Sequence, residues 1–449
     1  MKKYSFYIAA FVLLTSIGCS KKLDEINPDT QVRLESIADN DLPLIINGTY
    51  LALTSNNYNS YYYLHDMMSD DVETLPGNNF DNNAIPIADN SVALNFQYAY
   101  RAISNINILI QYAEGKSDPQ VQQYYAQGKF LRAYSYLRLV QHYGGVPIKL
   151  GTESVNEKPV RNTEQEVYDF IIADLKTAIS ILPDYTSGAL STFKITKQAA
   201  QALLARVYLE TGKNNEAKTE ALNVINSGKF TLDNNYSNFF GYSSNSTENI
   251  YRIAENSTAV SNPANSGLAL NYGAGDMVGN PPIKIGSGNI WIDSNLVNSY
   301  EMNDIRKTLF ISKINPSLNL SVYYTTKFPG EVNHAYPVLR LSEMYLIVAE
   351  ADARIGIVDV TKYNAVREKR GASTKLDTDF ANAQDFLNEI ENERRREFVG
   401  EALRWQDMRR FGTAIPYLQS KLRPAGNVLL PIPERELFLN PNMIQNKDY

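Results

Sequence analysis

The chain contains almost no cysteine: among its 449 residues only Cys19 carries a thiol. Cys19 has no partner within one chain, so an intramolecular disulfide is excluded, and so is a cysteine-rich metal site. The three histidines, His65, His142 and His334, lie far apart and without the spacing of metal ligands. The composition therefore supports neither a disulfide scaffold nor a metal centre.

An excess of basic residues is also lacking, and so are the common catalytic motifs. Lysine and arginine total 43 against 49 acidic residues, which gives a net charge of −6, whereas nucleic-acid binders normally carry a basic excess. The chain has no HExxH or GxSxG motif, and the glycines of residues 273–279 have the wrong spacing for a nucleotide loop. We therefore expect no nucleic-acid partner, no cofactor and no catalytic residue. A carboxylate pair for glycoside hydrolysis has no sequence motif, so sequence alone leaves that reaction open.

Long hydrophobic runs are absent except at the N-terminus. Residues 4–14 are apolar, follow Met1-Lys2-Lys3 and lead into the small or apolar residues 15–18. This pattern predicts a signal peptide over residues 1–18, too short for a permanent membrane span. Cys19 follows directly, where bacterial lipoproteins carry the lipid-acceptor cysteine, and the polar residues 19–38 are expected to form a lipidated tether. Ser16 stands where such sites usually carry leucine, so an ordinary signal peptide with an incidental thiol remains the alternative.

Helical periodicity occurs along much of the chain. Apolar residues recur at spacings of three and four, the pattern of amphipathic helices. The pattern predicts helices over residues 97–113, 120–143, 164–182, 196–211, 215–227, 340–355, 361–369 and 382–398. We therefore expect a mostly α protein.

One stretch, residues 202–225, has the spacing of a tetratricopeptide repeat, in which two helices pack as a pair. Small Ala205 and Ala217 would let the helices approach closely, and Gly212 would permit the tight turn between them. The sequence therefore predicts helical-repeat architecture. The spacing is set by Ala205, Tyr208, Gly212, Ala217, Ala221 and Val224.

Two partial copies of the first repeat helix occur at residues 129–145 and 341–356. Between the helical blocks, residues 72–92 and 234–291 are rich in Asn, Gly, Ser and Pro, which predicts long loops and short strands. Loops of this length in a compact protein are often functional. We expect them to build one face of the molecule.

Several blocks resemble the SusD/RagB family of outer-membrane nutrient-binding lipoproteins, over almost the whole chain. The resemblance covers the C-terminal signature and much of the N-terminal half. It rests on LRLSEMYLIVAEADA (339–353), YNAVREKRGA (363–372), ERRREFVGEALRWQDMRRFG (393–412), LLPIPERELFLNPNMIQNKDY (429–449), SDD (69–71), YRAISNIN (100–107), KFLRAYSYLRLVQHYGGVPI (129–148) and YEMNDIRK (300–307).

The resemblance implies a tetratricopeptide-repeat-type helical superhelix with loop and short-strand insertions, in a single SusD-like domain over residues 39–449. Its parts would be an N-terminal repeat half at about 39–233, a loop-rich insertion at about 234–335 and a signature region at about 336–449. Family members bind without cleaving, so no enzymatic activity is expected.

The resemblance also implies a role. Such proteins sit on the cell exterior, anchored to the outer membrane through a lipid, as a lid over a SusC-type TonB-dependent barrel. They capture an oligosaccharide and pass it to the barrel for import. A peptide cargo, or a scaffold that binds only proteins, is the alternative.

The signature block at 393–412 is expected to be structural. Its charges recur at spacings of three to four, so they could pair along a helix, and apolar residues lie beside them. The charges concerned are Glu393, Arg394, Glu397, Glu401 and Arg404.

The ligand site is expected in the variable loops, because sugars place their C–H faces on aromatic rings and their hydroxyls on Asn, Asp and Arg. Trp291 and Phe80 are the leading aromatic candidates, and a core role is the alternative for Trp291. For Tyr62, in the run at 61–63, the core interpretation is favoured, because consecutive helical residues point in different directions. The ligand-binding candidates are Trp291, Phe80, Tyr272, Asn79, Asp81 and Tyr62.

Overall fold

The computed structural model describes residues 34–449, except 55–57, 152, 154–156, 189, 256–270, 275, 279–282, 286, 316, 329–333 and 427. The chain divides into two units, residues 1–41 and residues 42–449. The first contributes two short 3-10 turns, η1 (Leu34–Ser36) and η2 (Asp39–Asp41). The predicted signal peptide, Cys19 and most of the predicted tether lie outside the described residues.

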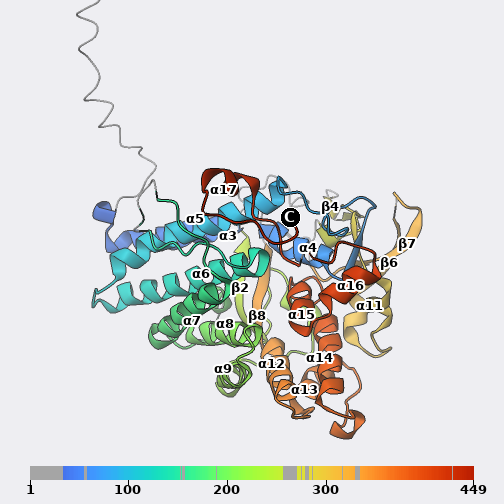
Figure 1. The fold of residues 1–449 in the computed structure, drawn as a ribbon. Helices are drawn as coiled ribbons and strands as arrows, with labels where there is room; N and C mark the ends of the chain where they lie inside the picture. Colours follow the sequence, from blue (N-terminus) through green and yellow to red (C-terminus); the bar gives the residue numbers. More distant parts are fainter. Residues whose placement is uncertain are drawn as a thin grey trace, which may run out of the picture. The chain divides into compact units, whose positions relative to one another are not determined.

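The second unit is mostly helical, with short strands inserted (Figure 1). The α-helices are α3 (Leu42–Thr54), α4 (Tyr58–Met68), α5 (Asn90–Ala113), α6 (Pro119–Tyr143), α7 (Glu164–Ile181), α8 (Lys197–Glu210), α9 (Asn214–Asn226), α11 (Ser294–Asn298), α12 (Leu341–Arg354), α13 (Thr361–Lys369), α14 (Ala383–Phe398), α15 (Arg404–Phe411), α16 (Ala414–Ser420) and α17 (Glu434–Leu439). The strands are β1 (Val72–Thr74), β2 (Asn249–Glu255), β3 (Asp276–Val278), β4 (Ile283–Ile285), β5 (Ile290–Ile292), β6 (Phe310–Asn315), β7 (Leu320–Thr325) and β8 (His334–Arg340). The 3-10 turns are η3 (Ser191–Phe193), η4 (Tyr236–Phe239), η7 (Ile305–Leu309) and η8 (Asp377–Asp379).

The predicted helices are confirmed, with ends that differ by a few residues; α5 begins earliest relative to its prediction. Side-chain caps explain several starts, because Asp89, Asp118 and Thr163 accept hydrogen bonds from the first free N–H groups of α5, α6 and α7. Helices α3, α4, α11, α15, α16 and α17 lie outside the predicted helices. Consecutive helices from α5 to α9 pack against one another, and α12 continues the series against α9, α13 and α14.

The predicted repeat pair is α8 and α9. Ala205 on α8 and Ala217 on α9 are fully buried, which allows the two helices to pack closely. Gly212 lies in the turn between them with φ +72°, a left-handed conformation that disfavours any residue with a Cβ. The mostly α, repeat-type fold expected from the sequence is therefore confirmed.

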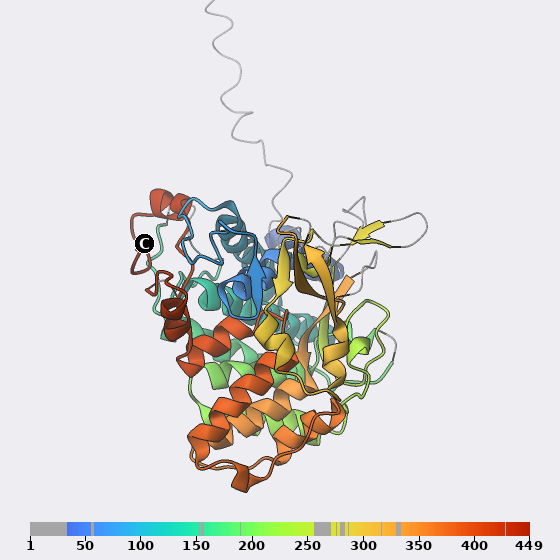
Figure 2. The ribbon, with the colours of Figure 1, turned by 90° about the vertical axis from the view of Figure 1, so that its right-hand side faces the viewer.

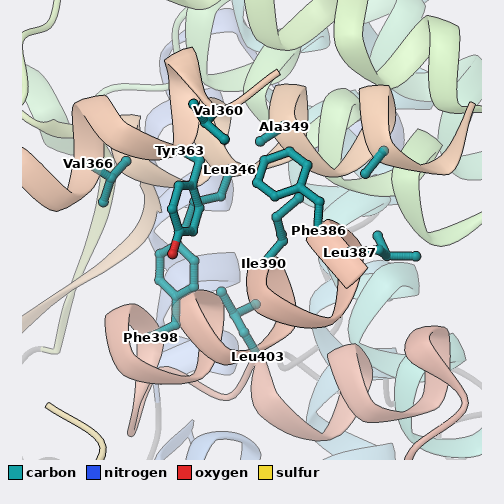
Figure 3. Packing of buried hydrophobic residues seen from close by; sticks show 11 residues of the cluster. Leu346, Ala349, Val360, Tyr363, Val366, Phe386, Leu387, Ile390, Phe398 and Leu403 are labelled. Atoms are coloured by element: carbon teal, nitrogen blue, oxygen red, sulfur yellow. The ribbon is translucent and has the colours of Figure 1, made fainter. Parts of the chain in front are cut away.

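A hydrophobic cluster joins α12, α13 and α14. Figure 3 shows side chains from these helices pointing toward one another, and the ring of Tyr363 lies 5.6 Å from that of Phe386. The cluster contains Leu346, Ala349, Ala353, Val360, Tyr363, Val366, Phe386, Leu387, Ile390, Phe398 and Leu403. This packing fixes α14, the helix that sends charged side chains toward the strands.

The strands form small antiparallel sheets in the inserted regions. One has the order β1-β5-β7-β6, and Figure 2 shows blue β1 standing beside the yellow later strands. In its register Glu73 lies opposite Trp291. The pair β2–β8 joins the segment after the repeats to α12. The predicted loop regions thus contain short strands, as expected.

A buried charge network lies between β8, α13 and α14. Glu397 accepts hydrogen bonds from Arg340 at 2.8 Å, from Arg370 at 2.8 Å and from Arg306 at 3.0 Å. Glu393 accepts from Arg306 at 2.7 Å. We call these five residues, with the partners Glu248, Arg367, Lys327 and Glu401, the buried charge network.

The expectation that charges of the signature block pair along a helix holds for Arg396 with Glu393 at 2.9 Å and for Arg410 with Asp407 at 2.8 Å, but most pairs of the block join different segments. Helix α14 ends at Phe398, so Glu401 and Arg404 lie beyond it. Arg394 pairs with Asp407 of α15 at 2.7 Å, and Glu401 pairs with Lys327 at 2.6 Å. Glu397 pairs with arginines of other segments, and Glu393 pairs with Arg306 as well as with Arg396 of its own helix. A buried carboxylate needs such opposite charges close by, because water does not solvate it. The block is, as expected, packed inside the fold.

Candidate functional site

A cavity of about 360 Å³ opens beside β1 and β5, and we call it the Trp291 cavity. Its walls come from β1, the following loop, β5, the start of α11, α14, and the end of α16. Its lining is Asp70, Val72, Glu73, Thr74, Asp81, Trp291, Asp293, Asn295, Arg395, Tyr417, Lys421 and Arg423. The lining therefore combines residues 70–81 with residues 395–423, which lie far apart in the sequence.

The β1–β5 ladder sets one wall. Glu73 and Trp291 are directly opposite in the register, so their side chains share a face of the sheet. The indole N–H of Trp291 donates to Glu73 Oε2 at 3.0 Å. Trp291 is 6% exposed. Glu73 is exposed, and its carboxylate keeps acceptor capacity beyond this one bond.

The loop after β1 forms a second wall through its own side chains. Asn78 Oδ1 accepts from the backbone N–H of Phe80 at 2.9 Å and of Asp81 at 3.1 Å, which closes a tight turn. Asp81 accepts from Thr74 Oγ1 at 2.9 Å and forms an ion pair with Arg423. The sequence GNNFDNN thus folds into a braced loop.

The floor of the cavity is an arrangement of carboxylates around two arginines. Arg404 donates to both oxygens of Asp70, at 2.6 and 3.0 Å. Arg395 lies 3.1 Å from Asp71 and 3.4 Å from Asp293. Burial raises the pKa of Asp71 to about 6, against the opposing charge of Arg395. For Asp70, burial also acts to raise the pKa, but Arg404 and Arg395 outweigh it, so the pKa lies below its ordinary value.

The rim is formed where α16 ends. Leu422 has φ 55°, and the backbone N–H of Arg423 donates back to the Leu418 carbonyl at 2.9 Å, which closes the helix. Arg423 Nη1 donates to the Tyr417 hydroxyl at 3.0 Å. Lys421 is exposed and has no ion pair among the residues that the structure describes. This turn therefore presents two cations to the cavity.

The structure brings together two of the predicted ligand residues, Trp291 and Asp81, in the cavity wall. Asn79 is exposed on the same loop, but it does not line the cavity. The side chain of Tyr62 lies outside the described residues.

Phe80 and Tyr272 do not offer the aromatic platforms expected of them. Phe80 is 7% exposed, because the loop closes over its ring. Tyr272 is 1% exposed, its hydroxyl donates to Asp66, and its ring lies 5.4 Å from that of Phe328. Burial raises the pKa of Asp66 well above its ordinary value. Unlike Trp291, which is also buried, neither aromatic side chain lines the cavity.

Sequence reasoning missed most of the charged lining. Arg395 belongs to the ERRREF stretch, which was interpreted as structural only, and Glu73 stood in a loop without a motif. Lys421 and Arg423 follow a short helix that had not been predicted. A usable signal was the SDD at 69–71, since such adjacent carboxylates require nearby cations when buried.

Two further cavities lie elsewhere. One of about 260 Å³ lies between the repeat helices and α15–α16, and Glu210 inside it is hydrogen-bonded by Gln141 at 2.7 Å and by Tyr168 at 3.1 Å. Another of about 330 Å³ lies between α5 and α17. The Trp291 cavity is the better candidate, because it is built on the inserted loops and because Lys421 in its lining has no ion pair among the described residues.

The part of the chain that the structure describes has neither a cluster of metal ligands nor a membrane-spanning helix. Within those ranges, no three His, Cys, Asp or Glu side chains are grouped to hold a metal ion. Within the same ranges, no helix has the length and apolar character needed to cross a bilayer.

Two family models match the chain. The model described as "Starch-binding associating with outer membrane" matches residues 23–209, and the model of the SusD family matches residues 322–425. They cover the predicted repeat half and the signature region, respectively.

Individual proteins and solved structures are also similar to this chain. SusD-like protein P2 of Formosa agariphila is 28% identical, with 99% of each chain covered. The starch-binding protein SusD of Bacteroides thetaiotaomicron is 25% identical, over 77% of this chain and 76% of that protein. A solved structure titled laminarin-binding SusD-like protein superposes with a TM-score of 0.75 at 22% identity, covering 91% of this chain and 99% of the other. The chain belongs to the SusD/RagB family.

Proposed function

We propose that this protein is a lipid-anchored lipoprotein on the outside of the outer membrane that captures oligosaccharides in the Trp291 cavity. It delivers them, as a lid, to a SusC-type TonB-dependent importer. Cys19 carries the lipid, and residues 19–38 act as the tether.

The observation that carries the proposal is the pairing of Glu73 with Trp291. The indole is held in place by its N–H bond to Glu73 at 3.0 Å, while the exposed carboxylate still accepts hydrogen bonds from hydroxyl groups. A fixed aromatic edge beside convergent polar groups is a common form of small-ligand site. The family descriptions, which name starch binding at the outer membrane, support a carbohydrate ligand.

We propose that the cavity binds its ligand without cleaving it. Glycoside hydrolysis needs a carboxylic acid with a raised pKa at the scissile bond. The pKa of Asp70, held by Arg404, is lowered. Burial raises the pKa values of Asp66, Asp71 and Glu210, but none of the three lines the Trp291 cavity.

Direct binding measurement tests the ligand site. The purified protein is titrated with starch-type and laminarin-type oligosaccharides, with acidic oligosaccharides and with a mixed peptide library. We expect an oligosaccharide to bind, and Glu73→Ala to weaken that binding about tenfold, since it removes an acceptor and the anchor of the indole.

The control is Glu368→Ala, an exposed α13 residue with no ion pair in the described part of the chain. Because Glu73 is exposed, the melting temperature of Glu73→Ala should stay close to the wild type. Binding of peptides alone would overturn the oligosaccharide proposal. Cleavage of a bound oligosaccharide would overturn the binding-only role.

Cell experiments test the location and the partner. Proteinase added to intact cells should degrade the protein, and Cys19→Ala should release it from the membrane. Affinity purification through this protein should recover a TonB-dependent barrel. Protection from the proteinase, or purification without a barrel, would contradict the lid role.

A further inference from the structure

The rim of the Trp291 cavity carries positive charge that the protein does not neutralise. Lys421 lines the cavity, is exposed, and has no carboxylate within ion-pair distance among the described residues. Its ammonium lies 6.0 Å from the centre of the Tyr417 ring, at the outer limit of a cation–π contact. All three of its N–H donors therefore remain for a ligand.

Arg423 stands beside it and is held rigidly. Its Nη1 donates to Tyr417 at 3.0 Å and its Nη2 pairs with Asp81. Asn83 Nδ2 donates to the carbonyl of neighbouring Pro424 at 2.6 Å, which fixes the turn to the loop after β1. Lys421 and Arg423, the cations of the rim, thus lie on a turn that these hydrogen bonds hold in place.

The turn itself is conformationally costly. Leu422, between the two cations, has a left-handed backbone with φ 55° and a side chain that is 95% exposed. A leucine in this conformation is disfavoured by its Cβ, and its exposed side chain gains no burial in return. Strained residues persist where a particular geometry is needed, often at ligand sites.

The carboxylates of the cavity, in contrast, already have partners. Asp70 is held by Arg404, Asp81 by Arg423 and Thr74, and Asp293 accepts the Leu296 N–H at 3.0 Å beside Arg395. Glu73, on the β1 wall, accepts the neutral indole N–H of Trp291 and stays open to hydroxyl donors. At the rim itself, the group without a counter-charge among the described residues is the Lys421 ammonium, which favours an anion there.

We infer that the cargo is an acidic oligosaccharide whose anionic substituent binds at the Lys421–Arg423 turn, while its hydroxyl groups reach the Glu73–Trp291 wall. The inference rests on the proposed function and specifies its ligand. A sugar carboxylate and a sulfate ester share this chemistry, and an ammonium presented on a rim binds either one.

The test uses matched pairs of ligands with the purified protein. Oligogalacturonides are compared with their methyl esters, which keep the sugar and remove the charge. Sulfated carrageenan oligosaccharides are compared with desulfated ones. We expect the charged member of one pair to bind at least tenfold more tightly, and more weakly as salt is raised, because exposed charges are screened.

Lys421→Ala should remove this preference, weakening the charged ligand about tenfold and leaving the uncharged one unchanged. Lys176→Ala, an exposed lysine of α7, is the control. Which pair shows the preference identifies carboxylate or sulfate.

Equal binding of charged and uncharged ligands, or an undiminished preference in Lys421→Ala, would overturn the inference and leave oligosaccharide capture intact. Failure of every oligosaccharide, neutral and acidic, would instead overturn the proposed function. Glu73→Ala separates the two results, because it weakens any sugar bound in this cavity.

Discussion

The buried charge network around Glu397 and the Trp291 cavity are built from the same residue types, and they differ in exposure and in pairing. Glu397 is fully buried and accepts from three arginines. Lys421 is exposed and has no carboxylate partner in the described part of the chain. Arg395, at the floor, is intermediate, with three carboxylates around it.

The difference separates stability from recognition. A buried charge must be compensated by the protein, because water cannot solvate it. A charge at a rim is solvated in the free protein and can exchange water for a ligand at modest cost. Substitutions in the network should therefore change folding, whereas substitutions at the rim should change binding.

Glu397→Ala should give the largest effect. It removes one of the carboxylates that Arg306, Arg340 and Arg370 share and leaves the network one buried negative charge short, so we expect a loss of about 3–5 kcal/mol in the free energy of unfolding. Urea denaturation followed by circular dichroism measures it. If the alanine variant does not fold, Glu397→Gln, which keeps the shape of the side chain, provides the free energy of unfolding instead.

Exposed Glu368→Ala is the matched control and should change stability by less than about 0.5 kcal/mol. A similar loss in Glu368→Ala and Glu397→Ala would remove the distinction between the network and the surface.

Acid should give the next largest effect, because it weakens the buried charge network. Burial acts to raise the pKa of Glu393, but Arg306, Arg396 and Arg367 outweigh it and hold the pKa at about 2, against an ordinary 4.5. A lowered pKa in the folded state means stability that is fully present above about pH 4.5 and is lost as the pH falls toward 2. The loss from this group is about 3 kcal/mol, from the difference between the two pKa values.

Denaturation at a series of pH values between 6 and 2 measures this loss. Glu393→Gln should be less stable at neutral pH and should show a shallower decline below pH 4.5. An unchanged slope in that variant would mean that other carboxylates carry the acid sensitivity.

Leu422→Gly should give the smallest effect and the opposite sign. Glycine adopts the left-handed conformation without a Cβ penalty, and the exposed leucine side chain contributes little burial. We expect the free energy of unfolding to rise by up to about 1 kcal/mol. Leu422→Ala, which keeps the Cβ, should not gain, and a gain in both variants would contradict backbone strain as the cause.

Much of the fold was predictable because its helices are long, periodic and capped. Asp118 before α6 and Thr163 before α7 mark starts that the periodicity also indicates. The missed helices lack such a pattern: α4 is YNSYYYLHDMM, and α15 is a short, charged RWQDMRRF. Tertiary contacts determine these elements, since α4 packs against α15.

The site was predictable only in part. Trp291 and Asp81 stood out as an aromatic and a carboxylate in polar loops. Lys421 and Arg423 have no local motif, and their place in the cavity depends on a contact between segments 342 positions apart, Asp81 with Arg423. Phe80 and Tyr272 are buried outside the cavity lining, and composition does not tell which face of a loop is buried.

The bond between Asn83 and the Pro424 carbonyl has a consequence for biogenesis. Its two partners are 341 positions apart, so one wall of the cavity is synthesised long before the turn that braces it. A nascent or truncated chain ending before Arg423 would carry Trp291 and Glu73 but no closed rim. The cavity rim is therefore completed only when almost all of the polypeptide has been synthesised and folded.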